Sequence, residues 1–410
     1  MEHTTNTTRR RLLATASGAV AWAGLGGTAL ADSKEPASQS NPGPVSADKP
    51  LPGYAKWKDA DDLIVHSANT IETQRAAVGT GGITPLDKLF IRNNVTPPSE
   101  DILADRDAWK VEIKGVKNPR TFTIAELKTI GIASVAMVLQ CSGNGRAYFP
   151  HKPSGTQWTT GAAGCVMFTG VPVKELLKAV GGADAQAKFM TGTGGEVIPA
   201  GLDPNTIMIE RSVPLEAMED ALLAWEINGE PLPIAHGGPL RMVVPGYTGV
   251  NNVKYIKQLA FTQDMSGAKI QQTSYRFSPV GVSGGPEHEV VWALPPKSWI
   301  TEPATSGETL KAGRVMVTGV ALGGTSAPAK IEVSLDGGKT WTEAAFVGPD
   351  LGKYAWRTFA LAAELPAGEH ELVSRVTNAA GESQPEARKE NNRGYNNNSW
   401  RDHGITVKVA

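Results

Sequence analysis

Apolar residues recur along this chain in short runs, and their period changes near residue 285. Between about residues 85 and 265, segments that alternate apolar and polar residues, as strands do, are separated by segments with a helical period. Thr123, followed three residues later by Glu126, predicts a capped helix start. The expected strands lie at residues 109–113 and 134–140, and the expected helices at residues 123–128 and 173–180. Short elements of both kinds predict an α+β domain.

After about residue 285 the alternation is that of strands alone. Turn signals such as Asp336-Gly337-Gly338 separate the apolar runs. The expected strands lie at residues 315–320, 329–335, 354–359 and 370–376. Roughly 110 residues of this pattern predict a β-sandwich of immunoglobulin-like size.

The first 31 residues carry the marks of an export signal. Residues 8–13 contain a twin-arginine pattern, residues 12–30 are nearly uncharged, and an Ala-Leu-Ala sequence at 29–31 supplies a cleavage site. A transmembrane anchor is the alternative. The run is rich in glycine and alanine, however, so we expect a cleaved signal peptide, no membrane anchor and a periplasmic protein exported by the twin-arginine pathway. Residues 32–56, rich in proline and serine, predict an exposed arm.

The composition is that of ordinary globular protein. The 410 residues include 40 Lys+Arg and 41 Asp+Glu, a formal charge of −1. No nucleic-acid partner is expected, because phosphate binding needs a basic surplus. The sequence has no dinucleotide fingerprint after a strand, no P-loop, no G-x-S-x-G and no C-x-x-C-H. These nucleotide, hydrolase and haem motifs therefore do not explain the chain.

One segment has unusual chemistry: an apolar run delivers Cys141 to a polar, glycine-rich loop with Arg146 five residues further on. A nearby cation lowers the pKa of a thiol and favours thiolate, the form that ligates metals or attacks electrophiles. The residues alone leave three roles open, namely a soft-metal ligand, a nucleophile and half of a disulfide. With only two cysteines in the chain, counting favours a Cys141–Cys165 disulfide.

Residues 139–146 resemble the molybdenum-cysteine loop of the sulfite oxidase family. Further segments agree with that family in order and spacing, and the resemblance covers about residues 80–410. These segments are residues 90–93, 157–162, 223–230, 236–246, 253–254, 271–275, 392–394 and 399–400. The resemblance implies a mixed α/β molybdopterin-binding fold followed by an immunoglobulin-like dimerisation sandwich. It divides the chain into a signal peptide (1–31), an N-terminal arm (32–80), a catalytic domain (81–285) and a dimerisation domain (286–410).

The family holds molybdenum through the dithiolene of molybdopterin and one cysteine thiolate, which the resemblance assigns to Cys141. Soft sulfur ligands suit such a metal. The implied cofactor-binding residues are Phe90, Asn93, His236, Arg241, Asn252, Val253 and Lys254. The cofactor expected from the resemblance is therefore molybdopterin with molybdenum.

The family's substrate pocket corresponds here to Arg92, Arg146 and Arg393, with Trp158 and Tyr275 in its wall. Guanidinium groups stay charged and bind tetrahedral oxyanions through two N–H groups, which suits sulfite and sulfate. Taken singly, each of these side chains would be read as surface or core. Their shared register with the cysteine loop is what assigns them to a pocket.

The chain also departs from the family. Asn94 stands where the family has a histidine, and no clear match to an acidic pterin contact of the animal enzymes occurs around residues 189–196. Residues 32–80 are too short, and lack the paired histidines, for the haem domain of those enzymes. The resemblance therefore implies a homodimeric sulfite dehydrogenase that oxidises sulfite to sulfate and passes electrons to an external c-type cytochrome.

Two other functions stay open at this point. The same scaffold could act on another sulfur substrate, as a sulfane dehydrogenase or a sulfoxide reductase. The chain could instead be a non-catalytic exported binding protein in which Cys141 and Cys165 form a disulfide.

Overall fold

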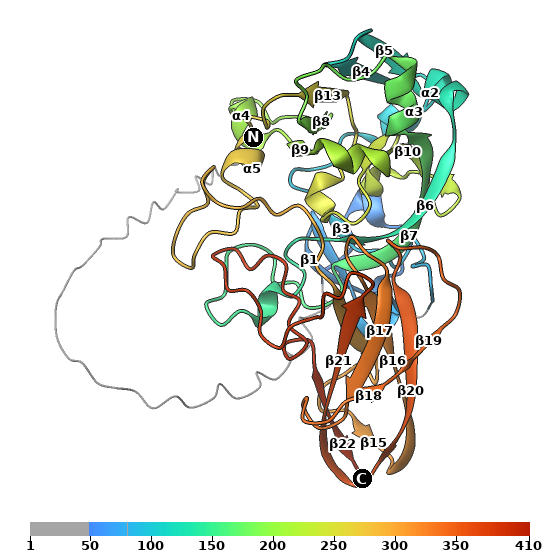
Figure 1. Ribbon diagram of the computed structural model, residues 1–410, viewed down its shortest axis with the longest axis vertical. Coiled ribbons are helices and arrows are strands. Elements are labelled where there is room, and N and C mark those ends of the chain that lie inside the picture. Colours follow the sequence, from blue (N-terminus) through green and yellow to red (C-terminus); the bar gives the residue numbers. More distant parts are fainter. Residues whose placement is uncertain (1–48, 80) are drawn as a thin grey trace, which may run out of the picture. The chain divides into compact units, whose positions relative to one another are not determined.

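The computed structural model describes residues 49–79 and 81–410, which belong to one compact unit (Figure 1). The expected signal peptide lies outside the described residues, as does the expected arm up to residue 48. Within the described ranges, no helix is long and apolar enough to cross a membrane.

Residues 49–79 take part in the fold and do not form the arm that the sequence suggested. A three-stranded sheet joins β1 (Leu63–Ser67), β2 (Thr70–Thr73) and β3 (Ile91–Arg92), and α1 (Arg75–Val78) follows β2. Ala55, Leu63 and Ile71 are buried in one cluster with Ile91 and Ala235. The apolar residues of this segment are thus held by contacts with later parts of the chain, and β3 brings Arg92 to its place.

The catalytic domain contains two five-stranded sheets. The first has the order β11-β10-β7-β6, with β12 also paired to β10, and the second has the order β5-β4-β13-β8-β9. The first comprises β6 (Ala133–Gln140), β7 (Ala163–Pro172), β10 (Leu222–Ile227), β11 (Glu230–Pro231) and β12 (Arg241–Val243). The second comprises β4 (Lys110–Lys114), β5 (Arg120–Thr123), β8 (Phe189–Thr193), β9 (Glu210–Pro214) and β13 (Gln258–Thr262).

The helices of this domain are short: α2 (Ile124–Ile130), α3 (Val173–Ala179), α4 (Pro204–Ile207) and α5 (Lys269–Gln272). The capping box expected at the start of α2 is present, because the Thr123 hydroxyl accepts from the Glu126 N–H and the Glu126 carboxylate accepts from the Thr123 N–H. Helix α3 ends just before Gly181, whose φ of 84° suits a glycine. The α+β reading of this half agrees with the structure.

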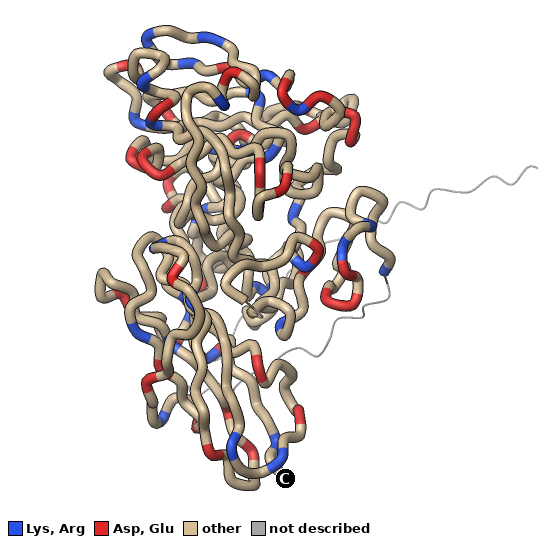
Figure 2. Tube along the Cα trace, turned by 90° about the vertical axis from the view of Figure 1, so that its right-hand side faces the viewer, with Lys and Arg blue, Asp and Glu red and all other residues tan. Residues whose placement is uncertain are grey.

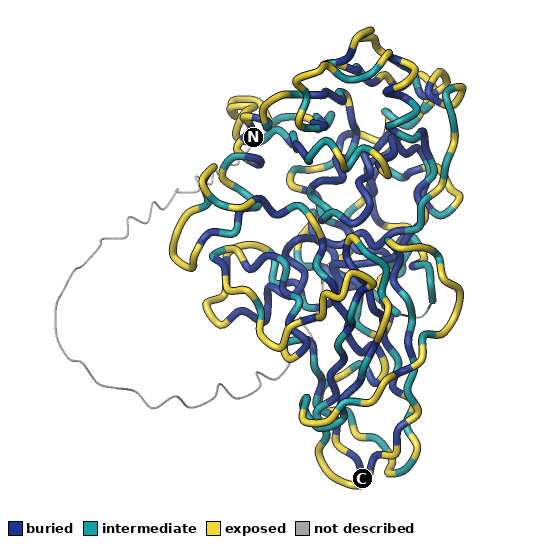
Figure 3. Tube along the Cα trace, viewed as in Figure 1, coloured by how far each residue is buried: buried dark blue, intermediate teal, exposed yellow. Residues whose placement is uncertain are grey.

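Two buried clusters lie on opposite faces of the first sheet. One joins Val171 and Leu223 of that sheet to the second sheet and to helices α2 and α3. The other joins Met137 and Leu139 of β6 to Phe90 and Trp158, and it includes Cys141. Buried backbone therefore runs through the centre of the domain (Figure 3), and the apolar face of β6 fixes where Cys141 emerges.

The C-terminal half is a sandwich of two sheets, with the orders β14-β16-β20-β19 and β15-β22-β21-β17-β18. The strands of the first sheet are β14 (Lys297–Glu302), β16 (Gly313–Leu322), β19 (Ala345–Val347) and β20 (Arg357–Leu365). Those of the second are β15 (Thr309–Leu310), β17 (Pro328–Ser334), β18 (Thr342–Glu343), β21 (Gly368–Asn378) and β22 (Ile405–Val409). Val317 and Phe359 of one sheet share a core with Val333 and Val376 of the other. The expected sandwich is present, and its immunoglobulin-like topology stays a prediction.

The sandwich packs directly on the catalytic domain. Val138 of β6 and Cys165 of β7 share a buried cluster with Trp299 and Trp356 of the sandwich, and the Val138 N–H donates to the Tyr354 carbonyl (2.8 Å). The connection between β21 and β22 returns to the cysteine loop, where the two segments lie side by side in Figure 1. Both halves of the chain therefore build the site.

Candidate active site

A network of hydrogen bonds fixes the loop that carries Cys141. The Cys141 N–H donates to the Ala162 carbonyl (2.9 Å), and the Asn144 N–H donates back to the Cys141 carbonyl (3.0 Å). The Asn144 side chain donates to the Gln140 amide oxygen (3.0 Å) and accepts from the Ala162 N–H (3.1 Å). The turn after β6 is therefore locked, with the cysteine at its start.

Both cysteines are free thiols. Cys165 is fully buried on β7, opposite Val138, and burial raises the pKa of its thiol to about 12. Cys141 is 8% exposed and lines two pockets. The disulfide that counting favoured is absent, so Cys141 is available as a ligand.

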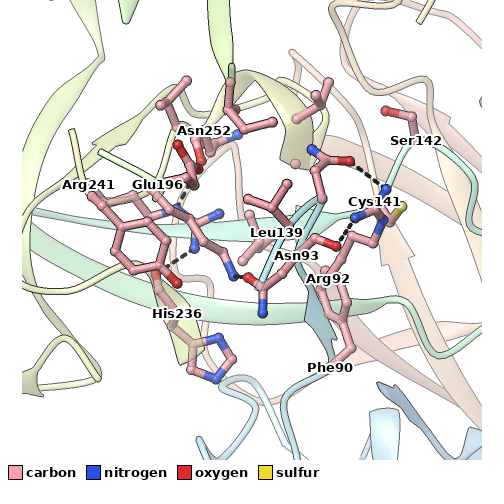
Figure 4. A pocket seen from close by; sticks show the side chains of 18 of the residues that line it. Phe90, Arg92, Asn93, Leu139, Cys141, Ser142, Glu196, His236, Arg241 and Asn252 are labelled. Carbon is pink, nitrogen blue, oxygen red and sulfur yellow. Dashed lines mark hydrogen bonds between the residues drawn. The ribbon is translucent and has the colours of Figure 1, made fainter. Parts of the chain in front are cut away.

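The first pocket, here named the inner pocket, gathers the residues expected to bind the cofactor (Figure 4). Its lining includes Cys141, Ser142, Glu196 and all seven of those residues, namely Phe90, Asn93, His236, Arg241, Asn252, Val253 and Lys254. They come from β12, from the residues on either side of β3, and from the segments after β6, β8, β11 and β12, which are far apart in the sequence. Their individual roles stay predictions.

Two of the cations that line the inner pocket, Arg241 and Lys254, are almost fully buried or bonded to buried groups. Arg241 donates to the carbonyls of His236 (3.0 Å) and Asn252 (3.1 Å), and burial lowers its pKa to about 10. Lys254 donates to the Asn93 side chain and to the Ala235 carbonyl, both at 2.6 Å. Burial, with the nearby Arg241 charge, holds the pKa of Lys254 well below its usual value. An anion in this pocket would relieve the cost of burying both charges.

Glu196 is an acidic residue that the sequence did not single out, although it lies within residues 189–196, where the sequence shows no clear match to the family's acidic pterin contact. It lines the inner pocket, and burial raises its pKa to about 7 against the opposing attraction of Lys254. It follows β8 and a pair of glycines, Gly194 and Gly195. A carboxylate directly after a glycine-rich loop at a strand end was the available signal.

The residues present fit a polar, anionic cofactor that carries a soft metal. His236 Nε2 and Ser142 Oγ line the inner pocket, are buried, and have no hydrogen-bond partner among the described residues. A Cβ at Gly249 would lie 3.1 Å from the Gln140 carbonyl oxygen, so only glycine leaves this wall open beside Cys141. Within the described ranges, no cluster of three or more His, Cys, Asp or Glu side chains could hold a metal ion. The thiolate of Cys141 is the soft donor that this pocket offers.

The second pocket, here named the outer pocket, has a volume of about 420 Å³ and shares Cys141 with the inner pocket. All three expected arginines line it, and so does Tyr275. Lys269 is a fourth cation, which no motif in the sequence indicated. No aspartate or glutamate is among the described residues of its lining. The outer pocket is therefore suited to a small anion.

Arg146 is held rigidly in the outer pocket. Its Nε donates to the Arg393 carbonyl (2.8 Å) and its Nη1 to the Thr156 carbonyl (3.0 Å), and the residue is only 6% exposed. A Cβ at Gly155 would lie 2.9 Å from Nη1, and one at Gly143 would collide with the guanidinium. Glycines thus make room for this side chain, which links the two domains.

Arg92 lies in both pockets and is held by its neighbours. Its Nη2 donates to the Asn94 side-chain oxygen (2.5 Å), and its Nη1 donates to the Asn93 carbonyl. The asparagine that replaces the family's histidine therefore orients an expected substrate arginine.

Trp158 does not line either pocket, in contrast to the sequence-based expectation. It is fully buried, with edge contacts to His66 (5.1 Å between ring centroids) and Phe90 (6.5 Å). Its carbonyl accepts from the Ala147 N–H (3.0 Å). Trp158 is a core residue. It belongs to the buried cluster that also contains Cys141, so it packs against the apolar side of the cysteine loop.

Lys297, the first residue of β14, ties the sandwich to the cysteine loop. Its ammonium is fully buried, donates to the Asn144 carbonyl (3.2 Å), and forms no ion pair with another described residue. Burial lowers its pKa from 10.5 to about 7. Burying an amine without an ion pair lowers the free energy of unfolding. The hydrogen bond to the Asn144 carbonyl offsets part of this cost and ties the sandwich to the cysteine loop.

Replacing this lysine, as Lys297→Met, should raise the free energy of unfolding by about 1–3 kcal/mol near pH 7. The pKa of Lys297 is lower in the folded protein than in the unfolded one. Above about pH 10.5 the amine is neutral in both states, so its burial does not reduce the free energy of unfolding, and the reduction grows as the pH falls towards 7. The gain should therefore shrink as pH rises. Urea unfolding at pH 7 and pH 9.5 measures this, with the exposed Lys311→Met as control. A gain that does not change with pH would contradict the assigned cost.

Comparisons with known proteins agree with this geometry. The model described as oxidoreductase molybdopterin binding domain matches residues 96–270, and that described as Mo-co oxidoreductase dimerisation domain matches residues 288–409. Mitochondrial sulfite oxidase of Macaca fascicularis is 32% identical over 384 residues, which cover 86% of this chain and 68% of that protein. Sulfite oxidase of Arabidopsis thaliana is 28% identical over 370 residues, covering 83% of this chain and 91% of that protein.

A solved structure is also similar. The sulfane dehydrogenase SoxCD from Paracoccus pantotrophus superposes with a TM-score of 0.70 at 26% sequence identity. The match covers 85% of this chain and 89% of that chain. The fold, the residues of the inner pocket and the similar proteins therefore all indicate a molybdopterin-binding oxidoreductase.

Proposed function

The chain belongs to the sulfite oxidase family of molybdopterin-binding oxidoreductases, and on that premise we propose that it is a sulfite dehydrogenase. Its cofactor is molybdopterin with molybdenum. The observation that carries the proposal is that Cys141 lines both a pocket with unsatisfied polar groups and a pocket lined by four cations.

In this proposal Cys141 ligates the metal through its thiolate, and Arg241 and Lys254 hold the anionic part of the pterin. The bound molybdenum supplies the two-electron redox chemistry that turns sulfite into sulfate. Arg146, Arg393 and Arg92 bind the oxygen atoms of the anion and raise its local concentration. Tyr275 lines the same pocket, and in this proposal its hydroxyl donates to an oxygen of the substrate.

Sulfite is favoured over a neutral sulfoxide because no acidic side chain among the described lining residues offsets the four cations. Sulfane dehydrogenation is the second candidate, and the similarity to SoxCD supports it. The free state of both cysteines argues against a disulfide-bonded binding protein.

Sulfite-dependent reduction of added cytochrome c or ferricyanide tests the proposal. We expect turnover with sulfite, none with a sulfoxide, and about one molybdenum per chain in protein from a molybdenum-replete host. A molybdenum-loaded protein that reduces neither acceptor with sulfite, yet does so with a protein-bound sulfane, would favour the second candidate. Protein without molybdenum after such expression would argue for the non-catalytic reading.

The electrons must leave the chain, and we propose that an external c-type cytochrome in the periplasm receives them. The twin-arginine pattern at residues 8–13 supports this location. Cell fractionation tests it, with replacement of Arg9, Arg10 and Arg11 by lysines as the variant that should keep the protein in the cytoplasm.

The match of residues 288–409 to a dimerisation domain supports a homodimer. We propose the outer face of the β16–β20–β19 sheet as the contact surface. Met316 (52% exposed) pairs with Ala362, and Val347 (39% exposed) pairs with Thr358. Figure 2 shows charged residues of both signs in the part of the molecule that carries the C-terminus. On the proposed face the exposed Arg314 and Glu364 lie directly opposite each other on β16 and β20, so each charge has an opposite charge beside it when the face is buried against its own copy.

Placing a carboxylate on this face, as Met316→Glu, should weaken the dimer by at least about 100-fold, because an unpaired charge would be buried in the contact. Size-exclusion chromatography with light scattering measures the change. The control is Met167→Glu, at an exposed methionine of the catalytic domain (38% exposed), which should leave the dimer intact. Equal behaviour of the two variants would exclude this face.

A further inference from the structure

The segment of residues 391–397, which lies between β21 and β22, forms part of the outer pocket. It contributes Arg393 and Tyr395 to the lining. The Asn396 N–H donates to the Ser142 carbonyl (2.7 Å), and the Asn397 side chain donates to the Gly145 carbonyl (3.0 Å). This segment is therefore fastened to the cysteine loop on both sides of Gly143.

Tyr395 stacks on Tyr275 inside the pocket. The ring centroids are 5.1 Å apart and the planes are inclined by 20°, within the range of favourable aromatic pairs. The Tyr275 N–H also donates to the Tyr395 hydroxyl oxygen (3.4 Å). Tyr395 is 3% exposed, and its place in the pocket was not expected from the sequence.

An arginine lies over the ring of each tyrosine. The Arg146 guanidinium carbon lies 5.6 Å from the Tyr395 ring centroid, and that of Arg211 lies 5.5 Å from the Tyr275 ring centroid. Arg211 is fully buried and fixed by the side chain of Asn251 and the carbonyl of Ile270. Cation–π contacts hold each of these arginines to its ring.

The backbone of Tyr275 explains why it needs such support. Its φ is 52°, in the left-handed region that a bulky residue other than glycine rarely adopts. Such a conformation persists only where the surroundings over-determine it. Arg211 contacts one tyrosine of the pair, and Tyr395 contacts both Tyr275 and Arg146. Tyr395 is therefore the residue that connects Tyr275 to Arg146, the arginine expected to bind the oxyanion.

We propose that Tyr395 is a positioning residue that fixes Tyr275 and Arg146 as one rigid wall against the anion. This inference rests on the proposed function, because it gives the outer pocket an oxyanion as its occupant. The stacked ring carries the effect, and the hydroxyl contributes one weak hydrogen bond.

Two variants separate the ring from the hydroxyl. Tyr395→Phe keeps the stack and removes the acceptor of the Tyr275 N–H, so sulfite KM should change by less than about 3-fold. Tyr395→Leu removes the stack and both aromatic contacts, so sulfite KM and the sulfate dissociation constant should rise by about 10-fold. Because the metal ligand is untouched, kcat should fall less than KM rises, and molybdenum content should not change. If Tyr395→Leu does not fold, Tyr395→Met replaces it with the same expectation.

Equilibrium dialysis with radiolabelled sulfate measures sulfate binding to the holoenzyme without turnover. Unchanged affinity in Tyr395→Leu, or a loss in Tyr395→Phe as large as that in Tyr395→Leu, would overturn the inference. A wild-type holoenzyme that binds sulfate but does not oxidise sulfite would refute the proposed function alone, since the effect of Tyr395 on sulfate affinity would still be measurable. Absence of sulfate binding to the wild type would overturn both.

Discussion

Cys141→Ser should accumulate as folded protein and oxidise sulfite more than about 100-fold more slowly than the wild type, a loss beyond that usual for residues that only support a metal ligand. A serine hydroxyl is not ionised near neutral pH and offers a hard oxygen where the metal has a soft thiolate. The loop itself is held by bonds of the Cys141 backbone and the Asn144 side chain, which the substitution keeps. Steady-state kinetics and molybdenum per chain measure the effect.

Cys165→Ser is the matched control, because it makes the same change at the other free cysteine. Cys165 lies in an apolar cluster at the domain boundary, where a hydroxyl in place of the thiol costs about 1–3 kcal/mol. Its variant should unfold at a lower denaturant concentration and keep its sulfite kinetics. Equal losses of activity in the two variants would mean that the effect is one of folding, and Cys141 would lose its assigned role.

The sequence predicted the elements whose signals are local. The capping box of Thr123 and Glu126 needs only four residues, and it is present as expected. The apolar run before Cys141 predicted β6, and residues 137–140 at its end are buried on both faces of the strand. The strands of the sandwich were found from a different local signal, the alternation of apolar and polar residues in a strand that buries one face.

Residues whose roles depend on contacts distant in sequence were harder to place. Trp158 shares a segment with pocket residues, and only the packing of Phe90 and His66 around it shows that it points into the core. Glu196 has no sequence motif of its own, and its proximity to Lys254 comes from β8 and β13 lying in one sheet. Tyr395 becomes part of the pocket because a long connection of the sandwich returns to the cysteine loop.

The resemblance to a family did what residue patterns alone could not. Arg92, Arg146 and Arg393 are separated by as many as 301 positions, and no periodicity or spacing relates them. All three nevertheless line the outer pocket. Agreement with a family in the order and spacing of motifs carries information about tertiary structure. It predicts nothing at positions where this chain differs from the family, such as Asn94, which accepts a hydrogen bond from Arg92.

Arg146→Ala should lower kcat/KM for sulfite by about 100-fold, mostly through KM, because it removes a buried, charged donor from the oxyanion pocket. Arg146 is held by the carbonyls of Arg393 and Thr156, so its guanidinium is oriented before the substrate arrives. Arg146→Lys keeps the charge but not the planar fork, and a lysine cannot reach both carbonyls and the anion in the same geometry. We expect it to lose about 10-fold, since single hydrogen bonds to charged groups contribute about 1.5–3 kcal/mol.

Arg388→Lys controls for the loss of a partly buried arginine near the same segment. Arg388 pairs with Asp402 (2.7 Å) and does not line the outer pocket. In Arg388→Lys the denaturant midpoint of unfolding should fall slightly, because a partly exposed ion pair contributes little to stability. Sulfite KM should stay within about 2-fold of the wild-type value, because Arg388 does not line the outer pocket. The acceptor's KM should be unchanged in every variant, since these arginines act on the anion. If sulfite KM is the same in Arg146→Ala, Arg388→Lys and the wild type, then the cations of the outer pocket bind something other than the substrate.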